Sequence, residues 1–311
     1  MRNHRKIQVH KVQQGNRVAK TKVVRPKRTI QVVQKEASRV KQNVIMIKKK
    51  GSGDSKPRPV KFQKNVEAAR YKDKKEITRN KNKIIRDANY KKIIELRNIG
   101  KGRILVMVAC GPSVSEVDFT PLLDDKNVDI MVINKPLKQV WPPKYWAFCD
   151  QSQYERNKSA FNGYTGSLIT SSAVRANKAN QTKIKAKHGT GVSRNLAEGY
   201  VIGRSSVYAN IQTAVWMNYD KIFIFGVDMC KVGQKLHHYG VNPDVPPEKR
   251  LERFKIEAKN YGWMAKEYPE EIRKKIFFCS SYNPWKFVEE FNKWDHTEAI
   301  GKILDVSKSI S

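Results

Sequence analysis

Acidic residues are scarce at the start of this chain: the first hundred of its 311 positions hold 7 Asp and Glu against 31 Lys and Arg. The later positions hold 22 acidic and 31 basic residues, so most of the net charge of +33 lies in the first third. A stretch with an excess of one sign favours a partner of the opposite sign. The sequence therefore predicts a basic, disordered arm over 1–64, a charged helix over 65–100 and a folded domain over 101–311.

Aromatic residues are also rare in the first hundred positions, where three are present: Phe62, Tyr71 and Tyr90. Their scarcity argues against stacking on unpaired bases and favours contact with phosphates that reads no sequence. The charge favours nucleic acid as the partner first and an anionic membrane surface second, with a solvated tail as the alternative. The expected contacts within the arm are its clustered cations: Arg25, Lys27, Arg28, Lys48, Lys49 and Lys50.

Long apolar runs, an N-terminal signal sequence and a Cys-x-x-Cys pair are all missing. The sequence thus predicts no transmembrane segment and a reducing, cytoplasmic location, which is the host cytoplasm if the protein is viral. The four cysteines lie at or just past the ends of expected strands. Their spacing fits no zinc or iron–sulfur pattern, so they are expected to be small buried residues rather than metal ligands: Cys110, Cys149, Cys230 and Cys279.

The most informative stretch is Ile104–Cys110, an unbroken apolar run that leads into a Gly-Pro-Ser turn. A run that is apolar on both faces is typical of a central parallel strand covered by helices. Similar runs alternate with helical patterns, which predicts a Rossmann-like α/β fold: a doubly wound, mainly parallel sheet with a basic, partly helical N-terminal extension. Strands are expected over 104–110, 128–134, 145–150, 167–170, 183–186, 221–228 and 275–279, and helices over 66–97, 151–161, 205–218, 250–266, 285–292 and 297–304.

Polar residues recur at the carboxyl ends of these strands: Gly111, Pro112, Ser113, Asn134, Asp150 and Asp228. In an open α/β sheet such ends converge on one crevice. Any one of them can simply cap a turn, but four such strand ends together favour a binding site. Arg204, Ser205 and Ser206 open a helix, where they form an ordinary cap or hold a phosphate or carboxylate.

A long loop over 229–247 carries His237, His238 and Tyr239 and is predicted to be a lid. A histidine there can be a general base, a metal ligand or a surface residue. Its titration near neutral pH suits the removal of a proton from an acceptor hydroxyl. Tyr239 or Lys235 would then stabilise a departing phosphate.

The order of these motifs resembles that of the bacterial lipooligosaccharide sialyltransferases. The shared features are the apolar strand with Gly-Pro-Ser and Glu116, the segment SSVYANIQTAVWMNYDKIFIFGVDM, and the loop with His-His-Tyr-Gly. The chain is also similar to the wider set of glycosyltransferase-like and 6-hydroxymethylpterin diphosphokinase-like proteins that share their fold. The resemblance covers 101–292 and leaves out the basic arm.

The resemblance implies a domain that binds a nucleotide-linked donor, with Gly111, Pro112 and Ser113 beside the donor phosphates. It implies that Asn134 contacts the nucleotide or a phosphate, that Ser205 and Ser206 contact the sugar or base, and that the histidine loop closes over the donor. A histidine of this loop is the base in that family, and tyrosines stabilise the leaving phosphate. Cys110 and Cys230 stand where the family has Asn and Tyr, which leaves the identity of the donor open.

The sequence thus predicts a glycosyltransferase-like enzyme that transfers a sugar from a nucleotide-activated donor to an acceptor hydroxyl, with His238 or His237 as the base. The basic arm places this work on or near nucleic acid, for example in the modification of phage or other viral DNA. One alternative on the same fold is ATP- and Mg²⁺-dependent pyrophosphoryl transfer, with Asp150 and Asp228 binding the metal. Another is an inactive nucleic-acid-binding or virion structural protein.

Overall fold

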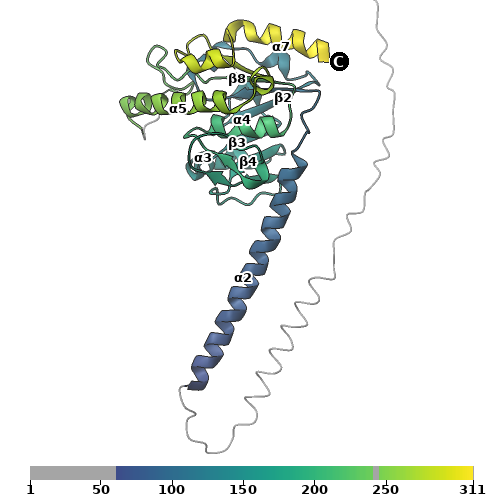
Figure 1. Ribbon diagram of the computed structural model, residues 1–311, viewed down its shortest axis with the longest axis vertical. Coiled ribbons are helices and arrows are strands. Elements are labelled where there is room, and N and C mark those ends of the chain that lie inside the picture. The colour runs from purple at the N-terminus through teal and green to yellow at the C-terminus, as the bar shows by residue number, and fades with distance from the viewer. Residues whose placement is uncertain (1–60, 241–244, 311) are drawn as a thin grey trace, which may run out of the picture. The chain divides into compact units, whose positions relative to one another are not determined.

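An eight-stranded parallel sheet forms the centre of the unit over residues 73–311 (Figure 1). The computed structural model describes residues 61–240 and 245–310. The strands lie in the order β10-β9-β8-β1-β2-β3-β4-β5, and a small two-stranded sheet pairs β6 with β7. Their bounds are β1 Ile104–Val108, β2 Val128–Ile133, β3 Tyr145–Phe148, β4 Ser167–Ser171, β5 Gln181–Ile184, β6 Ala186–Lys187, β7 Tyr200–Val201, β8 Lys221–Phe225, β9 Ile276–Cys279 and β10 Asn292–Trp294.

The sheet confirms the predicted Rossmann-like doubly wound fold, and β1 is its pivot. All five residues of β1 are buried, as the unbroken apolar run predicts for a strand covered on both faces. The chain passes from β1 to β2 on one side and later returns to β8 on the other, both in parallel register. The strand order therefore reverses at β1, and ligands of open α/β sheets bind at such a point, outside the carboxyl ends of the strands.

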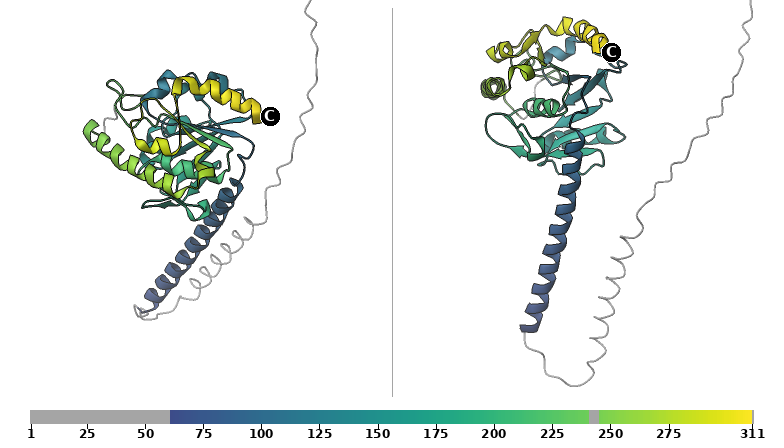
Figure 2. Two further views of the ribbon diagram at one scale, coloured as in Figure 1. Left: turned by 45° about the horizontal axis from the view of Figure 1, so that its top comes forward. Right: turned by 45° about the vertical axis from the view of Figure 1, so that its right-hand side comes forward.

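Helices cover the two faces of the sheet (Figure 2). Alternate residues of β1 divide between two apolar clusters, one with α4, α5 and the end of α2, and the other with α7 and short 3-10 turns. The helix bounds are α2 Lys61–Glu95, α3 Gln151–Arg156, α4 Ser206–Trp216, α5 Pro247–Glu267, α6 Glu270–Arg273 and α7 His296–Ile310. The 3-10 turns are Pro112–Glu116, Thr120–Leu122, Lys138–Val140, Lys158–Phe161, Leu196–Glu198 and Lys286–Glu290.

The charged helix predicted over 66–97 is α2. Residues 73–311 form one compact unit, which contains all of α2 from Asp73 onward. The last turns of this helix pack on the sheet domain: Ile93 is buried, and the Trp216 indole donates to its carbonyl at 3.0 Å. The described side chains between positions 74 and 88 are exposed, including Ile77 and Ile84. The sparse apolar pattern of this stretch predicts that exposure.

Two local predictions are wrong in detail. The segment expected as a helix over 285–292 is a 3-10 turn, Lys286–Glu290, followed by the edge strand β10. The helix expected over 151–161 ends after six residues and continues as a 3-10 turn. The segment after the Gly-Pro-Ser turn is also a 3-10 turn, Pro112–Glu116. Each of these segments is too short for the helical period to be distinguished from a turn.

The predicted nucleic-acid contacts Arg25, Lys27 and Arg28, and the lysines 48–50, lie outside the described residues. Within the described part of the chain, none of the helices combines the length and apolarity that a bilayer crossing requires.

Asp129, in β2, is held by hydrogen bonds and ion pairs at the amino edge of the sheet. Its buried carboxylate accepts hydrogen bonds from Tyr219 at 2.6 Å, from Lys144 at 2.7 Å and from the guanidinium of Arg103. Burial acts to raise the pKa of Asp129, but these donors outweigh it and hold that pKa below its ordinary value. The network fixes the edge of the sheet opposite the strand ends that form the site.

Replacing Asp129 by Asn removes the charge that Arg103 and Lys144 neutralise while keeping the shape of the side chain. We expect the free energy of unfolding to fall by about 2–4 kcal/mol because two cations lose a buried partner. Urea denaturation measures this loss. Asp124→Asn, at an exposed position of the same region, is the control and should change stability by less than about 0.5 kcal/mol.

Candidate functional site

A cavity lies at the carboxyl edge of the sheet, where β1 and β8 end side by side. The Gly111 amide donates to the Gly226 carbonyl at 2.8 Å, so the two chains run in close contact just past the strands. A Cβ at Gly111 would lie 2.5 Å from that carbonyl oxygen and 2.4 Å from a carboxylate oxygen of Asp228. Glycine is therefore required at position 111 for this approach.

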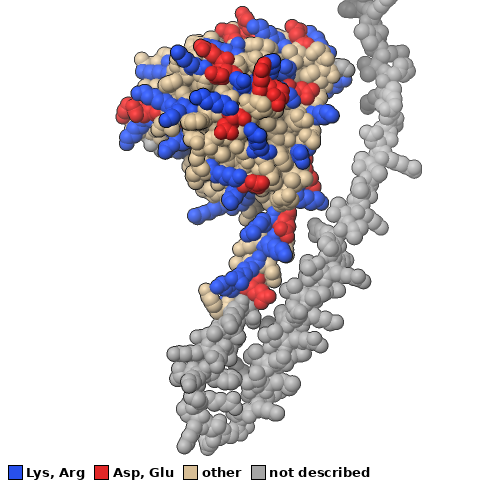
Figure 3. All heavy atoms as spheres, in the orientation of Figure 1, with Lys and Arg blue, Asp and Glu red and all other residues tan. Residues whose placement is uncertain are grey.

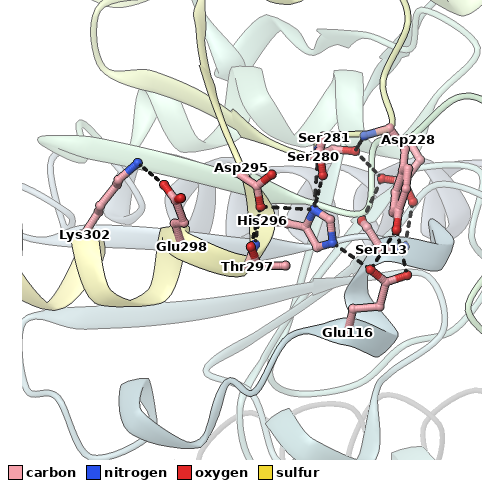
Figure 4. A network of polar contacts seen from close by, with 11 residues as sticks. Ser113, Glu116, Asp228, Ser280, Ser281, Asp295, His296, Thr297, Glu298 and Lys302 are labelled. Carbon is pink, nitrogen blue, oxygen red and sulfur yellow. Dashed lines mark hydrogen bonds and ion pairs between the residues drawn. The ribbon is translucent and has the colours of Figure 1, made fainter.

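Asp228 holds three strand ends together behind the cavity. Its carboxylate accepts the Ser113 amide at 2.8 Å and the Ser113 hydroxyl at 2.7 Å, and it accepts the Ser280 hydroxyl at 2.6 Å (Figure 4). These residues follow β8, β1 and β9, and Ser113 and Asp228 are almost fully buried. The bonds engage both carboxylate oxygens, so the role that the structure gives Asp228 is to position the cavity floor.

The second half of the network in Figure 4 fastens the start of α7 to the same edge. The buried His296 ring contacts the Ser281 hydroxyl at 2.8 Å through Nδ1 and the Glu116 carboxylate at 3.0 Å through Nε2. The Tyr282 hydroxyl donates to Glu116 at 2.9 Å. This anchoring keeps α7 against the 3-10 turn that follows β1.

The amino end of α4 forms one wall of the cavity with Arg204, Ser205 and Ser206. Arg204 has a left-handed backbone (φ 62°), which turns the chain sharply into the helix. Ser205 takes the cap position, but its hydroxyl makes no capping bond and contacts the Tyr261 hydroxyl at 3.4 Å instead. Ser206 and Val207 of the first helical turn line the cavity, and the helix dipole favours an anion at this end of a helix.

The opposite wall is α5, which carries Arg250, Arg253 and Glu257 toward the cavity. Glu257 is buried and accepts Arg253 at 2.9 Å and lies 3.5 Å from Arg250. Burial raises the pKa of Glu257, and the two guanidiniums oppose that shift. Arg253 also donates to the Arg204 carbonyl, so one carboxylate orients two arginines and braces the turn before α4.

Two polar atoms at the cavity are buried and have no hydrogen-bond partner in the protein, Oδ1 of Asn134 and Nε of Arg250. Asn134 has a left-handed backbone (φ 63°). Its backbone amide donates to the Ala147 carbonyl at 2.9 Å, and its backbone carbonyl accepts a bond from the Trp146 indole at 2.8 Å. Burying an unpaired polar atom is costly. A ligand with complementary polar groups would satisfy both atoms.

His237 and Tyr239 line the cavity from the loop after β8. Their rings stack with an interplanar angle of 8°, and the Lys135 ammonium lies 4.5 Å from the centre of the Tyr239 ring. Burial lowers the pKa of His237 to about 4, with Arg250 and His238 adding to the shift. Burial also raises the pKa of Tyr239 to about 12. The imidazole is therefore neutral at pH 7.

The structure brings eight of the predicted residues to the cavity: Gly111, Asn134, Asp150, Arg204, Ser205, Ser206, His237 and Tyr239. Pro112, Ser113, Asp228 and His238 do not line it. Asp150 is exposed at its rim. The His238 amide donates to the Cys110 carbonyl at 2.9 Å, and its Nε2 is buried without a partner. In the predicted lid, residues 241–244 lie outside the described residues.

Sequence reasoning missed the contribution of α5. Arg250, Arg253 and Glu257 recur at spacings of three and four residues beside Phe254 and Tyr261, so they share the inward face of the helix. Charged residues on an otherwise apolar face are the signal that could have found them. The arginines were hidden because basic residues are common throughout this chain.

The cysteines are free thiols. Cys110, Cys149 and Cys279 are buried as expected, whereas Cys230 is only partly buried. Burial raises the pKa of Cys110 to about 11, so it is a protonated thiol in the cavity wall. Among the residues that the structure describes, no three His, Cys, Asp or Glu side chains are grouped to hold a metal ion.

Comparisons of the chain with protein-family models, with curated proteins and with solved structures find no match.

Asp228→Asn should unfold the edge of the sheet more easily, because the amide nitrogen cannot accept the bonds that one carboxylate oxygen receives. We expect a loss of about 2–4 kcal/mol in the free energy of unfolding, measured by chemical denaturation. Asp305→Asn, which removes a surface ion pair on α7, is the matched control and should cost less than about 0.5 kcal/mol. Equal stability of the two variants would contradict the positioning role of Asp228.

The two loop histidines make stability depend on pH. Burial lowers the pKa of both His237 and His238 from 6.5 to about 4. Between these values the unfolded chain binds protons that the folded chain does not. The free energy of unfolding should therefore fall as pH drops from about 6.5 to about 4, by roughly 1–3 kcal/mol for each histidine. Denaturation at several pH values measures the slope, and His237→Gln should reduce it. Imidazole NMR signals of these residues that titrate near pH 6.5 would contradict the account.

Proposed function

We propose that this cavity binds the diphosphate of a nucleotide-activated sugar and that the protein transfers the sugar to an acceptor hydroxyl. The observation that carries the proposal is the gathering of three arginines, the amino end of α4 and the unpaired Asn134 oxygen at the point where the strand order reverses. Guanidiniums and helix amides are the groups that proteins use for phosphates. The resemblance of the motifs to glycosyltransferase-like proteins supports the choice of donor.

The size of the cavity limits which part of the donor it encloses. Its volume is about 140 Å³, which accommodates phosphates or one sugar ring but not a whole nucleotide sugar. The phosphates would lie between α4 and α5 beside Arg204 and Arg250. The unpaired Asn134 oxygen, just past the end of β2, would accept a hydrogen bond from a donor group of the nucleotide or sugar. The remaining part of the nucleotide-linked donor would extend through the open side.

In this proposal His237 is the base, because it lines the cavity and His238 does not. Its neutral imidazole takes the proton from the acceptor hydroxyl as the oxygen attacks the anomeric carbon of the sugar. The bond from that carbon to the phosphate oxygen breaks, and its electron pair leaves with the nucleoside diphosphate. The arginines and the Tyr239 hydroxyl stabilise the charge that develops on the leaving group.

Pyrophosphoryl transfer with ATP and Mg²⁺ is supported less well by the same residues. Of the two carboxylates predicted for the metal, Asp228 is engaged by Ser113 and Ser280, and Asp150 is at the exposed rim. Glu257, the other carboxylate of the cavity, is paired with Arg250 and Arg253.

Calorimetry with a panel of nucleosides, nucleoside diphosphates and nucleotide sugars tests the proposal directly. We expect binding only of the phosphate-bearing compounds. Arg204→Gln should weaken it about tenfold, because a charge-assisted bond is lost from an exposed side chain. Arg194→Gln, at another exposed position, is the control and should bind normally. Absence of binding by every compound, with and without Mg²⁺, would refute the proposal.

His237→Gln separates binding from chemistry. We expect it to keep the affinity for the donor and to lower the rate of sugar release to water or to an added acceptor by about 100-fold or more, because the base is lost. The rate with the wild-type protein should hold from pH 8 down to about pH 5, since the pKa of His237 is lowered to about 4. A rate unchanged by the substitution would exclude His237 as the base.

A further inference from the structure

A second concave surface lies on the outer side of α5, away from the cavity. It is a groove of about 460 Å³ between α5 and the segment 284–290. Four lysines line it, Lys255, Lys259 and Lys266 from α5 and Lys286 from the facing segment. We call it the lysine groove. Figure 3 shows blue side chains, with a few red ones among them, in the region where Figure 1 places α5.

The charge of the lysine groove is largely uncompensated. Its one carboxylate, Glu290, pairs with Arg273 at 3.4 Å. Lys255 lies 3.4 Å from Glu252, but both side chains are about 70 % exposed, so this pair is weak. A concave surface that holds several like charges concentrates anions from solution.

Gly262 lies in the middle of this groove and in the interior of a 21-residue helix. Glycine there costs about 1 kcal/mol relative to alanine. Packing does not require it, because a Cβ at Gly262 would meet no atom within 4 Å. The missing side chain keeps the groove open between Lys259 and Lys266.

Trp285 supplies an aromatic wall. Its ring is held in place, since its indole donates to the Met229 carbonyl at 3.1 Å and its backbone amide donates to Asn283 at 2.9 Å. Trp263, which is 42 % exposed, follows Gly262, and the Lys266 ammonium lies 5.5 Å from the centre of its ring. Trp285 is partly buried against the core and lines the groove, whereas Trp263 lies beside it on α5. Cations next to aromatic rings are the groups that bind single-stranded nucleic acids, with phosphates on the cations and bases on the rings.

We propose that the lysine groove binds single-stranded nucleic acid, with a base stacked on Trp285 and the backbone phosphates along Lys255, Lys259 and Lys266. A duplex fits less well because its bases are stacked on each other and do not reach a ring inside a groove. This binding does not depend on the chemistry in the cavity. A further role of the bound strand as the acceptor of a transferred sugar rests on the proposed function. Helix α5 separates the groove from the cavity.

Photocrosslinking of the full chain to an oligonucleotide of 5-iodouracil, followed by peptide mapping, tests the proposal. We expect a crosslink at Trp285 or Trp263 that weakens as salt increases. Lys259→Glu with Lys266→Glu should reduce this crosslink about fivefold or more. Lys126→Glu with Lys138→Glu makes the same change of charge at exposed positions elsewhere and should leave it intact.

Gly262→Leu distinguishes binding from a structural role. It fills the groove with a good helix former, so the melting temperature should stay the same or rise while the crosslink at Trp285 falls about fivefold. Crosslinks confined to residues 1–100, or crosslinks at α5 that all variants retain, would overturn the proposal. Equally, co-sedimentation with phosphatidylglycerol vesicles that the lysine variants lose, without any crosslink at Trp285, would assign the groove to a membrane surface. Calorimetry of donor binding reports on the cavity alone. Failure of this proposal and failure of the proposed function therefore give different results.

Discussion

The site depends on one buried carboxylate that joins the ends of three parallel strands. A parallel sheet brings its strand ends to one edge, where backbone amides no longer have partners in the sheet. Asp228 accepts two bonds from Ser113 after β1 and one from Ser280 after β9. The contact is so tight that position 111 admits only glycine. These hydrogen bonds all form within the protein, so the floor of the cavity is in place without a ligand.

The walls of the cavity add charge to this rigid floor. Glu257 engages Arg250 and Arg253 from the same helix, which fixes the direction of both guanidiniums without neutralising the whole set of arginines. Additional cations would raise the affinity for any anion. Guanidiniums that are held in one orientation instead favour an anion of matching shape. The unpaired Asn134 oxygen past the end of β2 adds an acceptor that a bare, ionised phosphate cannot satisfy.

More of the fold than of the candidate site could be predicted from the amino-acid sequence. Apolar runs such as 104–110 predict buried parallel strands because burial on both faces leaves a continuous pattern, and eight predicted residues do line one cavity. The hydrogen-bond partners of Asp228 could not be predicted from the sequence, because the same pattern places a carboxylate at a strand end whether it faces a ligand or two serines. The two neighbouring histidines posed a similar problem: only the path of the loop decides that His237, and not His238, reaches the cavity. The short edge strand β10 was missed because three residues are too few to show a period.

Helix α5 is a wall shared by two concave surfaces, with Arg250 and Arg253 on one side and the lysines of the groove on the other. The Trp285 indole adds a second link, because it bonds to the carbonyl of Met229, a residue of the cavity wall. Any ligand that shifts or stiffens this helix from one side alters the free energy of binding on the other. If ligands bind on both sides, thermodynamic reciprocity requires that each changes the affinity of the other by the same factor, and α5 then couples the two sites as well as separating them.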